Sequence, residues 1–490
     1  MRGTPVVAGP SSYFRPENID ELPAAERDLV ARRERLLGQA YRLFYERPIE
    51  IVRGEGTRLY DADGAEYLDV YNNVPSVGHS HPRVVEAIAR QAATLNTHTR
   101  YLSRGILDYS DDLLATLPPG IDNAMFTCTG SEANDLALRL AKGVTGNQGV
   151  IVTRNAYHGV TTEVAAISPS LGGENTVAPW VRIVDAPTGD GSEFVRQVVA
   201  ATDALRQSAH GLAAVIVDTV FASDGVVPGR HLPGSPGFLA PVVAATRAAG
   251  GLFIADEVQP GFGRLGSWPS AARTSTGTGT GTDTGTGTGS GTGRAAHDTD
   301  FTAPESGLWG FARHTIVPDI VTLGKPMGNG MPIAAMLARR DLVDAFGAEM
   351  RYFNTFGGNP VSIAAAQATL DVVRDEHLPQ NATAVGRYLV SQLTALAGTA
   401  AEIGDIRGAG LFIGVDIVDA HGQPDEARTV ALLNELRRRH VLIGASGLAN
   451  NTLKVRPPLP FSISDADRFL TELEGALTTL RHQRRSRPSA

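Results

Sequence analysis

Short apolar segments alternate with amphipathic ones through the middle of the chain, and this alternation constrains the fold more than any other feature. Strands that are apolar along their whole length are buried on both faces, as in a mostly parallel sheet covered by helices. The predicted strands are 149–152, 181–184, 214–217, 252–255 and 320–323, and the predicted helices around them are 132–142, 194–207 and 238–249.

The pattern changes toward both ends of the chain. Beyond about residue 360 long helices alternate with short strands, which is typical of an α+β domain. We therefore expect an α/β protein with a large domain and a smaller α+β domain built from both chain ends. The predicted divisions are an N-terminal arm with one helix (1–45), the first part of the small domain (46–90), the large domain (91–355), the rest of the small domain (356–480) and a basic tail (481–490).

A tract from Thr274 to Gly293 consists almost entirely of threonine and glycine. It has almost no apolar side chains to offset the entropy of ordering, so its composition predicts disorder. With its flanks, the loop extends over 267–306. Lengthening a surface loop costs little closure entropy. We therefore interpret the tract as an insertion that the fold tolerates.

Composition excludes several classes of function. The formal net charge of -8 argues against nonspecific binding to nucleic acid or anionic membranes. The single cysteine, Cys128, excludes an intramolecular disulfide and a cysteine-based metal site. No uninterrupted apolar run approaches the ~20 residues that span a bilayer. We expect a cytoplasmic enzyme that binds neither membrane, nucleic acid nor metal.

Two charged residues at predicted strand ends indicate the chemistry. Asp256 ends one apolar strand, and Lys325 follows another by a short turn. A lysine at the end of a buried strand is a candidate Schiff-base former, because desolvation lowers its pKa. A buried carboxylate nearby could hold a positively charged ring nitrogen. A P-loop NTPase could also place acids at a strand end, but the chain lacks the required G-x-x-x-x-G-K-[ST] motif.

Further motifs follow other predicted strands. Gly130 and Ser131 stand before an amphipathic helix, where free backbone N–H groups can hold an anion. Tyr157 offers an aromatic face after a strand, and Gln259 lies just beyond Asp256. Thr355 opens a polar, glycine-rich turn that is a second possible phosphate contact. Each of these signals is weak alone.

Taken in order, these motifs resemble the class III (ω-type) aminotransferases, which are fold type I pyridoxal-phosphate enzymes. The similarity covers about residues 45–480 apart from the insertion. The matching segments are Val77-Gly-His-Ser-His-Pro82, Thr129-Gly-Ser-Glu-Ala-Asn134, Tyr157-His-Gly159, Asp256-Glu-Val-Gln-Pro-Gly-Phe-Gly-Arg264, Gly324-Lys-Pro-Met-Gly-Asn-Gly330 and Thr355-Phe-Gly-Gly-Asn-Pro360.

The resemblance implies a role for each matching residue. Lys325 would form the Schiff base (internal aldimine) with pyridoxal 5′-phosphate and shuttle a proton, and Asp256 would keep the pyridinium nitrogen protonated. Gln259 would bond the phenolic oxygen, Tyr157 would stack on the ring, and Gly130 and Ser131 would hold the phosphate. Thr355 would reach the phosphate of a neighbouring subunit, which implies a homodimer and leaves a tetramer open. We interpret His158 as supporting its loop, Glu257 as structural and Cys128 as a buried small residue.

The substrate residues depart from the usual family pattern. Lys454 occupies the position of a family arginine that holds a substrate carboxylate, and Arg456 lies one strand period further on. A lysine cannot form the bidentate fork. Asp218 stands where many members carry glutamate. The Lys-x-Arg-Pro-Pro pattern resembles the subgroup related to alanine–glyoxylate aminotransferase 2, which includes amino-alcohol-phosphate phospholyases.

Two reactions therefore remain open, because both begin with removal of a proton from the carbon that carries the amine. We favour transamination between an amino acid or amine and an oxo acid. The alternative is elimination of phosphate from an amino-alcohol phosphate. Another chemistry of the family (epimerase or decarboxylase) and a non-catalytic regulator that binds pyridoxal phosphate are further alternatives, but the intact Lys325, Asp256 and Gln259 argue against the regulator.

Overall fold

The computed structural model describes residues 13–38, 40–172, 177–229, 237–267 and 307–485. A seven-stranded sheet forms its centre, in the order β4-β10-β9-β8-β7-β5-β6. β5 to β9 pair in parallel, and β10 is antiparallel to both of its neighbours. The strands are β4 (Asn123–Thr127), β5 (Gly149–Thr153), β6 (Val181–Val184), β7 (Leu212–Asp218), β8 (Leu252–Asp256), β9 (Ile320–Leu323) and β10 (Ala334–Ala338). The predicted mostly parallel sheet is confirmed.

Helices cover both faces of this sheet. Alternate residues of one strand enter different clusters: Val150 and Val152 of β5 pack with one set of helices, and Ile151 packs with the other. The first set is α4 (Gly130–Thr145), α5 (Thr162–Ala165) and α8 (Arg340–Glu349), and the second is α6 (Ser192–Arg206) and α7 (Leu239–Ala248). Burial on both faces explains why these strands are almost continuously apolar.

Two smaller sheets lie beside the large one. The first has the order β1-β2-β3-β13 and the second β11-β12-β15-β14. β13, from near the C-terminus, pairs in parallel with β3 through Val441 opposite Leu68. The strands are β1 (Ile51–Glu55), β2 (Arg58–Asp61), β3 (Glu66–Asp69), β11 (Ile403–Ala409), β12 (Phe412–Ile417), β13 (Val441–Leu442), β14 (Gly444–Ser446) and β15 (Thr452–Val455). The two chain ends thus share one sheet; the exact domain boundaries stay a prediction.

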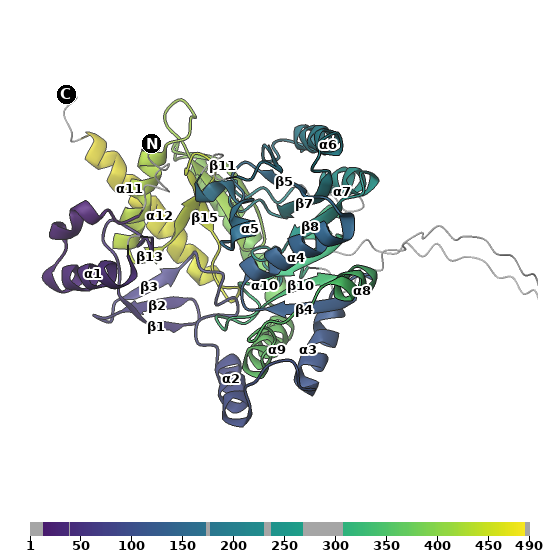
Figure 1. Ribbon diagram of the computed structural model, residues 1–490. Coiled ribbons are helices and arrows are strands. Elements are labelled where there is room, and N and C mark those ends of the chain that lie inside the picture. The colour runs from purple at the N-terminus through teal and green to yellow at the C-terminus, as the bar shows by residue number, and fades with distance from the viewer. Residues whose placement is uncertain (1–12, 39, 173–176, 230–236, 268–306, 486–490) are drawn as a thin grey trace, which may run out of the picture.

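The remaining helices surround these sheets. They are α1 (Ala24–Leu37), α2 (Pro82–Thr94), α3 (Arg104–Leu114), α9 (Pro360–Asp375), α10 (Leu378–Ala397), α11 (Glu426–Arg438) and α12 (Ile463–Arg485). Figure 1 shows β1–β3 beside α11 and the yellow α12 on one side of the molecule, with the large sheet on the other. α12 continues into the predicted basic tail, where Arg481 pairs with Glu402. No helix within the described ranges is both long and apolar enough to cross a membrane.

The threonine–glycine tract lies outside the described residues, as do 1–12 and 486–490. The described chain stops at Ser267 and resumes at Gly307. These two residues touch: a Cβ atom added to Gly307 would lie 2.8 Å from Ser267 Cα. The two flanks of the tract therefore meet, which agrees with an insertion at this point.

Candidate active site

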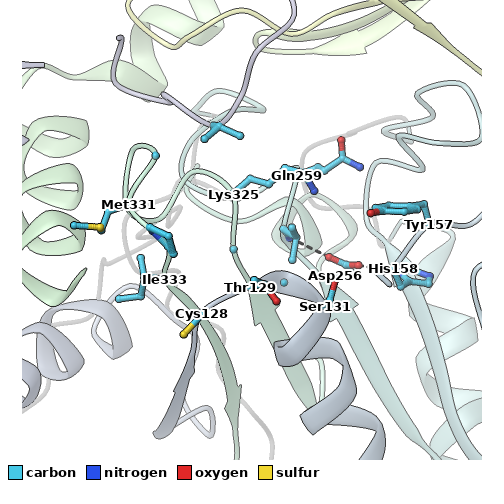
Figure 2. Close-up of a pocket in the computed structure, with 17 residues that line it drawn as sticks. Cys128, Thr129, Ser131, Tyr157, His158, Asp256, Gln259, Lys325, Met331 and Ile333 are labelled. Carbon is cyan, nitrogen blue, oxygen red and sulfur yellow. Dashed lines mark hydrogen bonds and ion pairs between the residues drawn. The ribbon is translucent and has the colours of Figure 1, made fainter. Parts of the chain in front are cut away.

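A cavity of about 330 Å³ opens where the carboxyl ends of β8 and β9 meet the start of α4. Ligands bind in this position in open α/β sheets. Figure 2 shows Lys325, Asp256, Tyr157 and Gln259 around this space, with Ser131 at the start of a helix. The lining residues are Val74, 128–131, 157–159, Asp256, Val258, Gln259, Gly324, Lys325 and 330–333.

The sheet register places the acids of the site side by side. Asp218 at the end of β7 lies opposite Asp256 at the end of β8, and Asp256 lies opposite Thr322 of β9. Lys325 follows β9 after a single glycine. Parallel strands therefore deliver the lysine and both carboxylates to one edge of the sheet.

Lys325 projects into the cavity and is only partly exposed. Its burial lowers the pKa of the amine, and the charge of Arg456 lowers it further, against the opposing effect of Asp256 and Asp218. A larger fraction of neutral amine is thus available than for a surface lysine. The turn that carries Lys325 is bonded to the segment at Val77 and Gly78. Asn329 Oδ1 accepts from Val77 N–H (3.0 Å), and Asn329 Nδ2 donates to Gly78 O (2.9 Å).

Asp256 is buried and held from three directions. Its Oδ2 accepts from Asn134 Nδ2 at 3.0 Å and lies 2.8 Å from His158 Nδ1. Its Oδ1 accepts from the N–H of Val258 at 3.0 Å. Asn134 is itself fixed, since its Oδ1 accepts from Thr322 Oγ1 at 2.6 Å. The carboxylate therefore has one orientation in the cavity.

The contacts of Asn134 and His158 with Asp256 were not predicted from the sequence. Both residues stand inside the matching motifs, Asn134 one helical turn after Gly130 and His158 directly after Tyr157. Their presence as polar residues within these motifs was the only signal in the sequence. The side chain of His158 contacts Asp256, and among the described residues only its backbone bonds within the loop, where its N–H donates to Ser168 Oγ at 3.0 Å.

The start of α4 forms an anion cradle. Thr129 and Glu132 form a capping box, in which Thr129 Oγ1 accepts from Glu132 N–H and the carboxylate of Glu132 accepts from Thr129 N–H. Among the described residues, the N–H groups of Gly130 and Ser131 have no acceptor. Glycine lets the helix start pack closely here, because a Cβ atom on Gly130 would lie 3.0 Å from the methyl groups of Val258. Two free donors at a helix N-terminus suit a phosphate.

Tyr157 lines another side of the cavity and is 36% exposed. Burial and the negative charge of Asp256 raise the pKa of its hydroxyl. Its loop is held against α4 by Ser131 Oγ, which accepts from the N–H of Val160 at 3.1 Å. The phenol ring lies near the carboxylate at the edge of the cavity (Figure 2).

We call Gly130, Ser131, Tyr157, Asp256 and Lys325 the cofactor end of the cavity. An amine for a carbonyl, a carboxylate for a ring nitrogen, two free N–H donors for a phosphate and a flat ring are gathered here within one cavity. This set of donors fits pyridoxal phosphate. The buried Nε2 of His158, which has no partner among the described residues, shows that the Asp256 cluster can still take a water or a ligand atom.

We call Tyr71, Asp218, Lys454 and Arg456 the substrate end. Gln259 joins it to the cavity, because its Nε2 lies 3.4 Å from Asp218 Oδ2 and its Oε1 accepts from Arg456. Lys454 and Arg456 are buried and do not line the cavity themselves. Burial and the charge of Arg456 lower the pKa of Lys454 to about 7. Burial and the charge of Asp256 raise the pKa of Asp218 to about 7.

Thr355 does not reach the cavity of its own chain. It is exposed, in the turn before α9. Exposed aromatic residues surround that turn: Phe353 is 44% and Phe356 69% exposed. Within one subunit the predicted phosphate contact is therefore absent among the described residues.

Two other expectations have clear outcomes. Glu257 is structural, as predicted: its buried carboxylate accepts from Thr219 Oγ1 (2.7 Å) and from the N–H groups of Gly310 (2.7 Å) and Phe311 (2.8 Å). It thereby fixes the segment that follows the insertion. The prediction that Cys128 is a buried small residue was wrong. Cys128 is half-buried and lines the cavity, because the strand β4 ends just before it at the cradle.

Comparison with known proteins identifies the family. The sequence model of aminotransferase class III matches residues 44–278 and 303–477. The chain belongs to the class III aminotransferases. Enzymes of this family use pyridoxal phosphate, which agrees with the residues of the cofactor end. The unmatched residues between the two parts fall within the predicted insertion.

Relatives of this chain carry two kinds of name. It is 35% identical to an alanine–glyoxylate aminotransferase 2-like protein of Drosophila melanogaster, over 93% of this chain and 88% of that protein. It is 33% identical to an ethanolamine-phosphate phospho-lyase homolog of Caenorhabditis elegans, over 93% and 94%. A solved phospholyase from Arthrobacter, in complex with phosphoethanolamine, is 38% identical with a TM-score of 0.80, over 92% of this chain and 100% of that one.

Proposed function

We propose that this enzyme eliminates phosphate from a small phosphorylated amino alcohol, such as phosphoethanolamine. The observation that carries the proposal is the pair of buried cations, Lys454 and Arg456, at the substrate end. Two positive charges in a site of low dielectric suit a phosphate dianion, and a lysine serves a phosphate without the fork that a carboxylate prefers. The similarity to a phospholyase that binds phosphoethanolamine supports this choice.

The residues of the cofactor end would each hold one part of pyridoxal phosphate. Gly130 and Ser131 would bind its phosphate, Tyr157 would stack on its ring, and Asp256 would pair with the ring nitrogen. Lys325 would bind its carbonyl carbon, and Gln259 would donate to its phenolic oxygen while Arg456 holds the other side of the amide. When bound, the cofactor supplies an electron sink for the carbon next to the substrate amine.

The protein's own groups would then manage the proton and the leaving group. Lys325 Nζ, kept partly neutral by burial, would take the proton from the substrate carbon that bears the amine. The positive charges of Lys454 and Arg456, buried behind the cavity wall, would attract the phosphate and stabilise the charge that grows on it as the carbon–oxygen bond breaks. Water completes the reaction: the organic product leaves as an aldehyde, with ammonia and phosphate as the other products.

We also propose a homodimer in which Thr355 of one copy contacts the phosphate held by the other. The exposed surface around Thr355 supports this. Phe353 packs edge-on against His98 (5.9 Å), and Tyr101 stacks on the same ring (5.1 Å). Leu102 beside them is fully exposed. Apolar patches of this kind mark protein interfaces. A tetramer that contains the same dimer is also compatible.

Transamination is the second candidate, favoured by the relative named after alanine–glyoxylate aminotransferase 2. In that case Arg456 would hold the carboxylate of an amino acid. The site geometry serves both reactions up to removal of the proton. They differ in what leaves the enzyme afterwards, and that difference can be measured.

The test incubates the holoenzyme with phosphoethanolamine and measures free phosphate, ammonia and the visible absorbance of the cofactor. Elimination releases phosphate and ammonia in equal amounts and leaves the absorbance unchanged after turnover. Transamination instead bleaches the absorbance, requires an oxo acid to restore it and releases no phosphate. A bleached enzyme without phosphate release would overturn the proposal in favour of the second candidate.

The cofactor site can be tested separately. The chain contains only three lysines, Lys142, Lys325 and Lys454. Borohydride reduction fixes the cofactor to the lysine that holds it, and peptide mapping then identifies that lysine. We expect the label on Lys325 alone. A label on Lys454 or Lys142 would show that the cofactor end has been assigned wrongly.

A further inference from the structure

A row of aromatic rings connects the N-terminal arm to the substrate end. Tyr13 stacks on Phe44, with ring centroids 5.6 Å apart and an interplanar angle of 16°. Phe44 meets Tyr71 edge-on, at 5.7 Å and 80°. The backbone supports the first pair, since Tyr13 and Phe44 form an antiparallel bridge and Phe14 N–H donates to Leu43 O at 2.8 Å. The row thus begins in the arm and ends beside Arg456.

The arm is anchored independently of this row. Phe14, Leu22 and Val30 form a small apolar cluster of their own. Arg47 pairs with Glu26 of α1. The neighbour of Phe44 is also fixed: the buried hydroxyl of Tyr45 donates to Ile443 O and accepts from Ile443 N–H, both at 3.0 Å. The backbone next to Phe44 is therefore anchored to the C-terminal part of the chain through the contact of Tyr45 with Ile443.

Two contacts restrict the ring of Tyr71. Phe44 lies on one side of its ring, and the backbone of Gly444 lies against another. A Cβ atom on Gly444 would meet Tyr71 Cε2 at 2.6 Å. Glycine at this position therefore lets the ring approach β14, and the arm keeps the ring there.

Tyr71 in turn fixes Arg456. Arg456 Nε donates to Tyr71 O at 3.2 Å, and its guanidinium lies over the Tyr71 ring at 5.0 Å. The N–H of Arg456 donates to Val70 O at 2.8 Å. The other end of the guanidinium donates to Gln259, which lines the cavity. A shift of Tyr71 would therefore move Arg456, which contacts the cavity wall at Gln259.

We propose that Tyr13 and Phe44 are positioning residues that fix Tyr71, and through it Arg456, and so set the affinity of the enzyme for the anionic group of its substrate. Tyr13 stands before the first residue that the family model matches. Substrate affinity in this chain is thus set partly by a segment outside the shared family region. The inference rests on the proposed function only in taking Arg456 as a group that binds substrate.

The test compares holoenzymes that carry Tyr13→Ala, Tyr13→Phe and Gly444→Ala with wild type. Tyr13→Ala removes the outer ring of the row, and Tyr13→Phe keeps it. Gly444→Ala displaces Tyr71 from the opposite side. The matched control is Tyr41→Ala, because Tyr41 lies in the same arm, is 64% exposed and takes no part in the row. Two measurements are made: hydrogen exchange of the peptide over 69–76, and KM and kcat with phosphoethanolamine.

We expect faster exchange of that peptide and a KM raised about fivefold, with kcat within about twofold, for Tyr13→Ala and Gly444→Ala. Tyr13→Phe and Tyr41→Ala should match wild type in both. Unchanged exchange and unchanged KM in Tyr13→Ala would overturn the inference, as would equal effects of Tyr13→Ala and Tyr41→Ala. If the wild-type enzyme releases no phosphate, the proposed function fails. The inference is then still tested by two measurements on the same variants: hydrogen exchange of the peptide over 69–76, and inhibition by inorganic phosphate of the reaction that the enzyme does catalyse.

Discussion

The cofactor end of the cavity is assembled along one edge of the seven-stranded sheet, whereas the substrate end draws on all three sheets. Asp256 and Lys325 stand at the ends of neighbouring parallel strands, whose register brings them together. Asp218 comes from the same large sheet, but Arg456 follows β15 of a second sheet and Tyr71 follows β3 of the third. The first arrangement depends on strand order, and the second depends on how separate sheets dock.

This difference has a consequence for function. The carboxyl ends of parallel strands meet at the same edge of the sheet in any protein of this fold. The cofactor end can therefore be kept while the substrate end varies with small changes in docking. Relatives of similar identity that carry the names of an aminotransferase and of a phospholyase agree with such a division.

The largest effect is expected from breaking the cofactor end. Lys325→Ala should lower activity by about 10⁴-fold, because in the proposed mechanism this amine both binds the cofactor and moves the proton. The assay is steady-state turnover together with borohydride labelling. Lys142→Ala is the matched control, since Lys142 pairs with Glu163 away from the cavity. If the turnover rate of Lys325→Ala stayed within tenfold of the wild-type rate, the assignment of Lys325 to the cofactor end would be wrong.

A change of pH should affect the substrate end. Below about pH 7 Lys454 carries its proton and Asp218 is neutral, and above it Lys454 is neutral and Asp218 is negative. Positive charge is thus lost as pH rises, and kcat/KM for a phosphorylated amine should fall by about tenfold between about pH 6 and about pH 8. Lys454→Arg keeps its charge over this range, so its profile should be flatter. Identical profiles would show that Lys454 does not face the substrate.

Two tyrosine variants test how much the contact between the two chain ends contributes to stability. Tyr45→Phe should lower the free energy of unfolding by about 1–3 kcal/mol, because the buried N–H and carbonyl of Ile443 lose their partner. Tyr109→Phe is the matched control, since the buried hydroxyl of Tyr109 has no partner within the described ranges. The measurement is the urea midpoint of each holoenzyme. Equal midpoints for the two variants would mean that the Tyr45 bridge contributes nothing.

The smallest effect is expected from the insertion. Replacing 268–306 with two glycines should leave kcat, KM and the melting temperature close to wild type, because Ser267 and Gly307 already touch. The family model also leaves 279–302 unmatched. If this replacement prevented the enzyme from folding or from binding its cofactor, residues 268–306 would be needed for the structure, and the interpretation as a tolerated insertion would be wrong.

Strand type in the large sheet could be predicted only where burial leaves a clear pattern. β5 to β9 are almost wholly apolar and were identified. β4 begins with Asn123 and is only half-buried over its first three residues. β10 consists of alanine, methionine and leucine, which favour helices when judged by propensity alone. Both strands were missed, because pairing with neighbours far along the chain, and not local preference, makes them strands.

The sequence by itself predicted which residues gather at the cofactor end, because they stand in short motifs at strand ends and parallel strands bring those ends together. It also marked the insertion by composition. Only the tertiary structure showed that Asn134 and His158 orient Asp256, that Thr355 lies away from the cavity of its own chain, and that Tyr71 holds Arg456 against Gln259. These contacts join residues up to hundreds of positions apart across separately packed sheets. Their geometry follows from docking, for which a local sequence pattern carries no signal.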